Sequence, residues 1–286
     1  MEKIFRVATR SSPLALRQAE MAAAFLSKKI PNSRFEILPM KTTGDKSLEW
    51  SLEARGGKGL FTKELEDALL CGRADIAVHS AKDLPVSLAE GLAVSCLLPR
   101  DDCRDVLIRK NSSDSLRLIS TASPRRRAQL KKLFPEAEFT QIRGNVGTRL
   151  KKILEGEADA TMLSAAGLDR LGIAAYEGLG FERLSLDKCV PAAAQGIIAV
   201  QTRTADAEFF GKFSDAKAEL AASLERGFLS ALGGGCQTPF GANFDGEFFR
   251  VYHEKTGFLK FDFSGFSEED KMLAAAKNCA KKILDM

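Results

Sequence analysis

The sequence predicts an α/β protein with two similar lobes and a smaller α+β region towards its C-terminal end. Three observations support this fold class: apolar runs alternate with helical patterns, one helix-and-strand pattern occurs twice, and the pattern changes near residue 215. The 286 residues suffice for about two domains and leave room for a small third.

Each predicted lobe begins with the same succession of strand, cap and helix. Ser12 is a suitable N-cap, and Pro13 suits the first helical position, where a missing amide costs no hydrogen bond. Ser123 and Pro124 repeat this arrangement. We therefore expect strands at residues 4–8 and 118–122, with helices at 13–26 and 124–134.

A second repeat supports two similar lobes. Residues 72–81 and 156–165 share the pattern G-x-A-D followed by an apolar strand, and they agree at five of ten positions. The alternative is coincidence, because G-x-A-D is a simple way to end a helix. In both copies a helix with apolar residues at i, i+4, i+7 and i+8 precedes the pattern: Phe61, Leu65, Ala68 and Leu69, then Val146, Leu150, Ile153 and Leu154.

The alternation of strands and helices predicts a largely parallel sheet in each lobe, with ligand-facing loops at the strand ends and a central cleft between the lobes. From about residue 215 the pattern becomes a helix through Leu232, then Phe-rich alternating segments near residues 240–264, then an amphipathic helix ending near Ile283. These features predict the small α+β region.

Composition and charge exclude several classes of protein. Apolar residues make up 45% and charged residues 28% of the chain, which excludes a disordered or low-complexity protein. No segment reaches the roughly 18 apolar residues of a membrane span, and residues 1–4 lead into a strand pattern instead of a secretory apolar core. We therefore expect a cytoplasmic protein with no membrane partner.

The distribution of cysteine and histidine predicts no metal site. The six cysteines include no C-x-x-C pair, and His79 and His253 lie far apart in the sequence. His79 lies within a strand pattern and is expected to be a packed residue. A net charge of +4 is too small to indicate nucleic acid, and no aromatic residues alternate with the basic loops to stack on bases, so no nucleic-acid partner is expected.

The arginines indicate an anionic ligand because they gather where loops meet helices. Arg125 and Arg126 lie in the first helical turn, where free amides and the helix dipole already favour an anion, so two cations there suggest a ligand that offsets them. Any one arginine alone could be a solvated surface residue. The set predicts a polyanion site and also contains Arg10, Arg143, Arg149 and Arg170.

Three further residues are candidates for chemistry. Lys58 lies in a glycine-rich loop that lacks the spacing of a phosphate-binding Walker loop, so a nucleotide cofactor has no support. Asp83 follows a strand and would be an ionised carboxylate suited to stabilising positive charge on a substrate, or simply a turn residue. Cys236 follows three glycines that could carry its thiol into a cleft, or it packs there. Cys71, Cys96 and Cys279 instead have apolar neighbours typical of core residues.

Five motifs in this order resemble the hydroxymethylbilane synthase family, also called porphobilinogen deaminase. The resemblance extends from about residue 4 to residue 241 and is carried by residues 7–16, 56–61, 78–85, 143–150 and 234–239. It implies three domains, two of them lobes like those of bilobal binding proteins. The implied bounds are 1–98 with 197–214, 99–196, and 215–286, with hinges near residues 98 and 196.

The resemblance also implies an activity in tetrapyrrole and haem biosynthesis. A dipyrromethane cofactor would be attached to Cys236 through a thioether, and four porphobilinogen molecules would be added in turn, each losing ammonia, before water releases a linear tetrapyrrole. Each pyrrole carries an acetate and a propionate, which bidentate guanidinium groups can hold. We expect a monomer with this small-molecule substrate.

The resemblance assigns roles to particular residues. Asp83 would be catalytic, because it would accept hydrogen bonds from pyrrole N–H groups and stabilise the cation formed when ammonia leaves. The residues implied to bind the cofactor are Cys236, Lys82, Asp83, Ser123, Arg125, Arg126, Arg143 and Gly144, and those implied to bind substrate are Arg10, Ser12, Lys58, Arg149, Arg170 and Gln195.

The chain departs from the family pattern at a few places. Pro124 replaces the usual leucine, the segment 114–120 is short, Ala194 stands where glycine is common, and Gln201 replaces a common acidic residue. The competing hypothesis is a non-catalytic bilobal anion-binding protein, which leaves Cys236 without a function.

Overall fold

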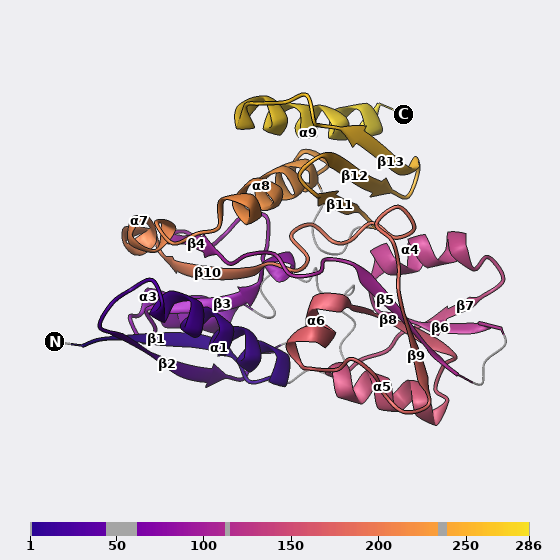
Figure 1. Cartoon of the computed structure of the whole chain (residues 1–286), viewed down its shortest axis with the longest axis horizontal. Coiled ribbons are helices and arrows are strands. Elements are labelled where there is room, and N and C mark those ends of the chain that lie inside the picture. The colour runs from indigo at the N-terminus through magenta and orange to yellow at the C-terminus, as the bar shows by residue number, and fades with distance from the viewer. Residues whose placement is uncertain (1, 44–61, 112–114, 234–238, 286) are drawn as a thin grey trace. The chain divides into compact units, whose positions relative to one another are not determined.

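The structure is a computed structural model that describes residues 2–43, 62–111, 115–233 and 239–285 (Figure 1). The chain forms two compact units. The first consists of Met1–Asp101 and Ile197–Glu219, and the second of Asp102–Gly196 and Leu220–Met286.

The first unit contains a mixed five-stranded sheet in the order β2-β1-β3-β10-β4. β1 pairs in parallel with β2 and β3, whereas β10 is antiparallel to β3 and β4. The strands are β1 (Lys3–Arg10), β2 (Ser33–Met40), β3 (Ile76–Ser80), β4 (Leu92–Leu97) and β10 (Ile198–Arg203), and the helices are α1 (Pro13–Ser27), α3 (Lys63–Leu70), α7 (Ala207–Gly211) and the short 3₁₀ turns η1 (Ala81–Asp83) and η2 (Thr204–Asp206).

Helices pack on both faces of this sheet. Val7 of β1 belongs to the apolar core that includes Ala22 of α1, whereas the next residue, Ala8, belongs to the core that includes Leu65 of α3. Since successive side chains of a strand point to opposite faces, α1 and α3 cover opposite sides.

The second unit contains a sheet with the same arrangement, in the order β7-β6-β8-β5-β9. β6 pairs in parallel with β7 and β8, and β5 is antiparallel to β8 and β9. The elements are β5 (Asp105–Lys110), β6 (Leu118–Ser120), α4 (Pro124–Leu133), β7 (Glu138–Thr140), α5 (Val146–Glu155), β8 (Ala160–Ser164), α6 (Ala165–Arg170) and β9 (Leu179–Arg183). The shared order confirms the two similar α/β lobes predicted from the sequence.

The sheets differ from the expectation in one respect, because half of the strand pairs in each are antiparallel. In each sheet the fourth strand is antiparallel to both of its neighbours, and it is the strand that the chain forms just after it passes between the units: β5 begins after Asp102 and β10 after Gly196. Such a strand enters the sheet from the other unit, so it is not joined to its neighbour by a local helix crossover, the connection that makes neighbouring strands parallel.

The repeated G-x-A-D pattern has the same structural role in both lobes. The carboxylate of Asp75, just before β3, accepts a hydrogen bond from the backbone amide of Arg6 in β1 at 2.8 Å. Asp159 accepts one from the amide of Leu118 at 2.8 Å. In each lobe the aspartate just before a strand, β3 or β8, therefore bonds to the backbone of the parallel neighbouring strand, β1 or β6, and this shared role accounts for the recurring pattern.

Both predicted serine caps are confirmed. The side chain of Ser12 accepts a hydrogen bond from the amide of Ala15 at 3.3 Å, and that of Ser123 accepts one from the amide of Arg126 at 3.4 Å. In each helix a proline follows the cap, as predicted.

The C-terminal part of the second unit forms a separate three-stranded antiparallel sheet, β11-β12-β13. The elements of this part are α8 (Ala216–Ala231), of which residues 216–219 belong to the first unit, and β11 (Gly241–Phe244), β12 (Phe248–His253), β13 (Gly257–Asp262) and α9 (Glu269–Leu284). One apolar core contains Phe228 of α8, Phe249 of β12 and Ala276 of α9, and the rings of Phe228 and Phe249 lie 5.6 Å apart. This confirms the predicted small α+β region, whereas a domain boundary at residue 215 remains a prediction.

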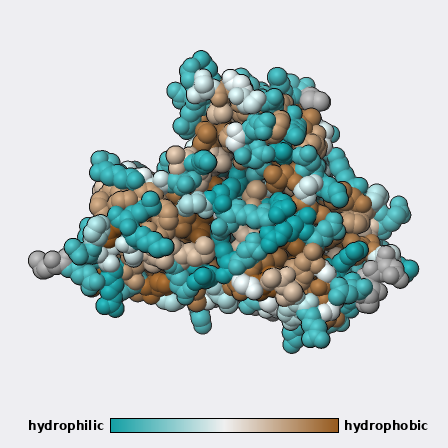
Figure 2. Space-filling view, viewed as in Figure 1, coloured by the Kyte–Doolittle hydropathy of each residue, from teal (hydrophilic) through white to brown (hydrophobic). Residues whose placement is uncertain are grey.

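The surface shows scattered apolar residues. On the face drawn in Figure 2, hydrophobic residues lie between hydrophilic ones, and large exposed apolar side chains such as Ile4, Leu154 and Phe258 belong to different elements. No helix within the described ranges has both the length and the apolar character that a membrane crossing needs.

Candidate functional site

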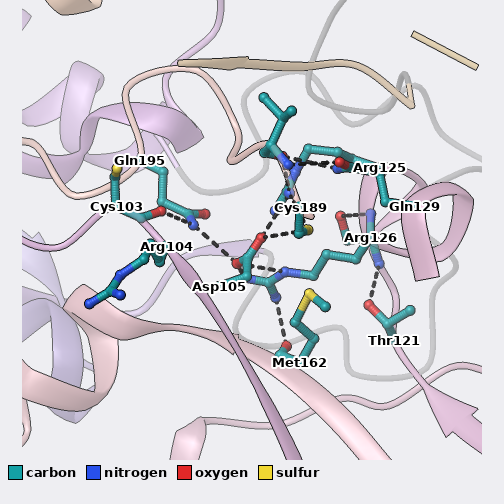
Figure 3. Close-up of polar contacts among 12 residues, drawn as sticks. Cys103, Arg104, Asp105, Thr121, Arg125, Arg126, Gln129, Met162, Cys189 and Gln195 are labelled. Atoms are coloured by element: carbon teal, nitrogen blue, oxygen red, sulfur yellow. Dashed lines mark hydrogen bonds and ion pairs between the residues drawn. The ribbon is translucent and has the colours of Figure 1, made fainter. Parts of the chain in front are cut away.

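A buried carboxylate, Asp105, holds the two adjacent arginines at the start of α4. Its Oδ1 atom accepts hydrogen bonds from Arg126 Nη2 at 2.7 Å and Nε at 3.2 Å, and its Oδ2 atom lies 2.8 Å from Arg125 Nη1. Asp105 is 0% exposed, and the arginines are 4% and 8% exposed. Figure 3 shows both guanidinium groups converging on this carboxylate.

Two further side chains donate to Asp105. Gln195 Nε2 lies 3.0 Å from Oδ1 and also donates to the carbonyl of Cys103 at 2.7 Å. The thiol of Cys189 lies 3.6 Å from Oδ2. Asp105, the first residue of β5, therefore connects this strand to the first turn of α4 and to the segment 189–195.

Backbone carbonyls hold the other ends of the guanidinium groups. Arg126 Nη1 donates to the carbonyl of Met162 at 2.8 Å, and Arg125 Nη1 donates to that of Val190 at 2.7 Å. The amide side chain of Gln129 braces Val190 by accepting from its N–H at 2.7 Å and donating to its carbonyl at 3.0 Å. Each guanidinium group therefore has two fixed contacts.

The cluster keeps one positive charge without a counter-ion inside it. Burial opposes ionisation of Asp105, but Arg125 and Arg126 outweigh it and hold the pKa of Asp105 well below its usual range. Burial, together with the charge of Asp105, raises the pKa of Cys189 to about 12, so its thiol is neutral near pH 7. Two cations thus face one anion, and a net positive charge in a buried place favours an anionic ligand.

This arrangement changes the reason given for the arginines. Arg125 and Arg126 lie in the first turn of α4, as predicted, but the prediction assumed that a ligand offsets both charges. Asp105, which was not predicted as a site residue, offsets one of these charges. The sequence signal that could have identified Asp105 is its position as a single acid directly before the apolar run Val106–Ile108. An acid buried with such a run needs a cationic partner.

The loop between β7 and α5 contains the next predicted group. Gly144 has φ of 112°, a left-handed conformation that favours glycine. Arg149 Nε donates to the carbonyl of Gly144 at 2.8 Å, and Asn145 caps α5 by accepting from the amide of Thr148 at 2.9 Å. Arg143 is partly buried in the same loop. The structure thus brings together three predicted residues: Arg143, Gly144 and Arg149.

Arg170 contacts the residue that follows Gln195 in the chain. Arg170, the last residue of α6, donates from Nη2 to the carbonyl of Gly196 at 2.6 Å. Gln195, implied by the resemblance to touch substrate, is buried and directs its amide towards Asp105 and Cys103.

The remaining described candidates belong to the first unit. Lys82 and Asp83 lie in η1 directly after β3, and Asp83 is exposed. Arg10 ends β1, and Ser12 caps α1. Lys58 and Cys236 lie outside the described residues.

His79 is a packed strand residue, as predicted. It is buried in β3, and its Nε2 atom is hydrogen-bonded to Gln201 Oε1 at 3.0 Å. Burial lowers the pKa of His79 to about 4, so the ring is neutral at pH 7. Cys96 is buried as predicted, but Cys71 is exposed because it follows α3 instead of lying on its packed face.

Comparisons with known proteins agree with the motifs. The family model described as "Porphobilinogen deaminase, dipyromethane cofactor binding domain" matches residues 5–210. A porphobilinogen deaminase of Chloroherpeton thalassium is 42% identical over 251 residues, which cover 85% of this chain and 79% of that protein. A chloroplastic porphobilinogen deaminase of Oryza sativa is 43% identical over 251 residues, covering 84% of this chain and 69% of that protein.

Among solved structures, the periplasmic VFT2 domain of Bordetella pertussis BvgS matches 78% of this chain and 94% of its own, with 17% identity and a TM-score of 0.44. The family assignment comes instead from the sequence relatives. Because the family model spans well over half of the chain, and relatives above 40% identity cover most of it, the chain belongs to the porphobilinogen deaminase family.

Proposed function

We propose that this chain is the transferase that condenses four porphobilinogen molecules, with loss of ammonia, onto a dipyrromethane primer and then releases linear hydroxymethylbilane. The observation that carries the proposal is the buried pair Arg125 and Arg126, which retains one positive charge beside Asp105. In a chain of this family, such a pair suits a substrate and a cofactor that are rich in carboxylates.

The described residues fit the dipyrromethane that the family model names. Among them no acceptor is recorded for Arg125 Nε or Nη2, so these donors remain for a ligand carboxylate. When bound, the dipyrromethane supplies the primer to which pyrrole units are added. We propose that it is attached to Cys236 and held by Lys82, Asp83, Ser123, Arg125, Arg126, Arg143 and Gly144.

The proposed roles of the protein's own groups follow from their charge and exposure. Asp83 is an exposed carboxylate at the end of a strand, where it can accept N–H hydrogen bonds and stabilise a cation. Arg10, Arg149 and Arg170 offer guanidinium groups to substrate carboxylates. Ser12 and Lys58 supply further polar contacts, and Gln195 acts through Asp105.

We further propose the organisation that the family resemblance implies. The chain would have three domains, comprising residues 1–98 with 197–214, 99–196, and 215–286. It would act as a cytoplasmic monomer with porphobilinogen as its small-molecule substrate.

Intact-mass measurement of purified protein, together with conversion of porphobilinogen, tests the function. We expect a covalent adduct of two pyrrole units that disappears, along with activity, in Cys236→Ser. The matched control is Cys71→Ser, which removes an exposed thiol and should keep both. Active protein without an adduct would overturn the proposal, and so would a wild-type protein that binds carboxylates but does not convert porphobilinogen.

A further inference from the structure

We propose that Asp105 is a positioning residue: it fixes the two guanidinium groups of Arg125 and Arg126 and limits the positive charge that they present to an acidic ligand. This inference rests on the proposed function, because it assigns a role to a buried carboxylate next to residues proposed to hold the cofactor.

The geometry leaves Asp105 little freedom. Its Oδ1 atom is used by Arg126 at 2.7 Å and by Gln195 at 3.0 Å, and its Oδ2 atom by Arg125 at 2.8 Å. The residue is 0% exposed, so water does not replace any of these donors. A carboxylate held in this way is a rigid anchor for its partners.

Each arginine is fixed at two points and still has donors to offer. Arg126 is fastened to Asp105 and to the carbonyl of Met162, and Arg125 to Asp105 and to the carbonyl of Val190. Arg125 uses Nη1 for both of these contacts and for a longer one, 3.8 Å, to Cys189 Sγ, so the N–H groups of Nε and Nη2 have no acceptor among the described residues. The anchor therefore determines where these donors point.

The charge of Asp105 has a second consequence. With Asp105 the pair presents one net positive charge, and without it two guanidinium groups would face each other with no anion between them. Their repulsion would separate them, and any small anion would be drawn into the place of the missing carboxylate. A multivalent anion such as sulfate is the simplest probe of this change.

Two substitutions separate charge from position. Asp105→Asn keeps the size of the side chain and removes its charge, whereas Asp105→Glu keeps the charge and moves the carboxylate by one methylene. The matched control is Asp187→Asn, because Asp187 pairs with Arg250, another largely buried arginine of the same unit, at 2.6 Å and is outside the proposed site. All variants are made in the full chain.

The experiment measures the fraction of protein with the two-pyrrole adduct, kcat and KM per loaded molecule, and the protection that sulfate gives against thermal unfolding. For Asp105→Asn we expect kcat per loaded molecule to fall at least about tenfold, as for removal of one partner from a buried charge pair. Sulfate should protect Asp105→Asn against thermal unfolding at lower concentrations than those that protect wild type. Asp105→Glu should lose turnover but respond to sulfate as wild type does, and Asp187→Asn should match wild type in both.

The readouts distinguish this inference from the proposed function. If both Asp105 variants turn over per loaded molecule like Asp187→Asn, and sulfate protects all variants equally, the inference is overturned. If wild type carries no adduct and makes no product, the proposed function fails, yet sulfate protection still decides the role of Asp105. If Asp105→Asn does not fold, Asp105→Glu decides alone. Reduced turnover of Asp105→Glu with an unchanged response to sulfate supports the inference, whereas turnover of Asp105→Glu equal to that of wild type overturns it.

Discussion

The backbone amide of Ala194 donates a hydrogen bond to the buried carboxylate of Glu225, with an N–O distance of 2.6 Å. Ala194 has φ of 58°, a left-handed backbone conformation that residues other than glycine rarely adopt. The other oxygen of Glu225 accepts from the amide of Phe244 at 2.7 Å. Glu225 thus ties α8 to the segment before Gly196 and to β11, and this contact favours the strained conformation of Ala194.

Ala194→Gly should be tolerated in spite of complete burial. Relief of the left-handed conformation gains about 1–2 kcal/mol, whereas the added freedom of the unfolded chain and the lost methyl contacts each cost somewhat less than about 1 kcal/mol. We expect the free energy of unfolding to change by no more than about 0.5 kcal/mol, measured by urea denaturation.

Ala193→Gly is the matched control. Ala193 is also buried, but it has no positive φ, so glycine there relieves no strain. The greater freedom of the unfolded chain and the lost methyl contacts should lower the free energy of unfolding by about 1–2 kcal/mol. Equal destabilisation by the two substitutions would show that Ala194 is not strained.

Gly144→Ala should disturb the loop that presents Arg143 and Arg149. An added Cβ would lie 2.7 Å from Thr148 Cγ2, and φ of 112° is unfavourable for alanine. We expect a loss of about 1–3 kcal/mol in the free energy of unfolding, or an equivalent local distortion. Since Arg149 donates to the Gly144 carbonyl, the KM for porphobilinogen should also rise.

Gly147→Ala serves as the comparison for Gly144→Ala. Gly147 lies in α5, and its added Cβ would approach only Asn145 Oδ1, at 3.7 Å. Alanine is the better helix former by up to about 1 kcal/mol, so stability should be kept or raised. A Gly144→Ala protein as stable as Gly147→Ala would contradict the crowding at Thr148.

Much of this architecture could be predicted from local sequence patterns. The Ser12 and Ser123 caps depend on side chains that bond within one helical turn, and the C-terminal elements follow their apolar periodicity. The pairing of Asp105 with Arg126 could not be predicted, because it joins residues of two different elements, β5 and α4, that are 21 positions apart. The hydrogen bond from Ala194 to Glu225 likewise joins residues that are distant in sequence, 31 positions apart.

His79 should make stability depend on pH below neutrality. Its pKa falls from an ordinary 6.5 to about 4 in the folded protein because it is buried. Between these values the unfolded chain binds a proton that the folded protein does not, so stability present above pH 6.5 is lost as the pH falls. The loss reaches roughly 3 kcal/mol near pH 4, and urea unfolding at pH 7 and pH 5 should detect it.

His79→Gln should flatten this pH dependence, since glutamine keeps a polar group near Gln201 but does not titrate. Carboxylates also titrate in this range, so the measured quantity is the difference in slope between variant and wild type. His253→Gln is the companion variant, because burial also lowers the pKa of His253 and gives a contribution of the same sign. Identical slopes in wild type and His79→Gln would rule out a neutral buried ring.

Asp83→Asn tests the proposed catalytic carboxylate. The substitution keeps the size of a side chain that is exposed in η1 and removes only its charge. A group that stabilises a cation in the transition state contributes little to substrate binding, so its loss should lower kcat by about 100-fold or more and change KM by less than about threefold. Steady-state kinetics on adduct-loaded protein measures both quantities.

Asp67→Asn provides the control for Asp83→Asn, because Asp67 is an exposed carboxylate of the same unit, on α3. A general effect of lost negative charge would slow both variants alike, whereas a local effect on the reacting cation requires only Asp83→Asn to be slow. A rise in KM without a fall in kcat would mean that Asp83 binds the ground state of the substrate. In that case the carboxylate would belong with the arginines as a contact residue, and the stabilisation of the cation would have to come from another group.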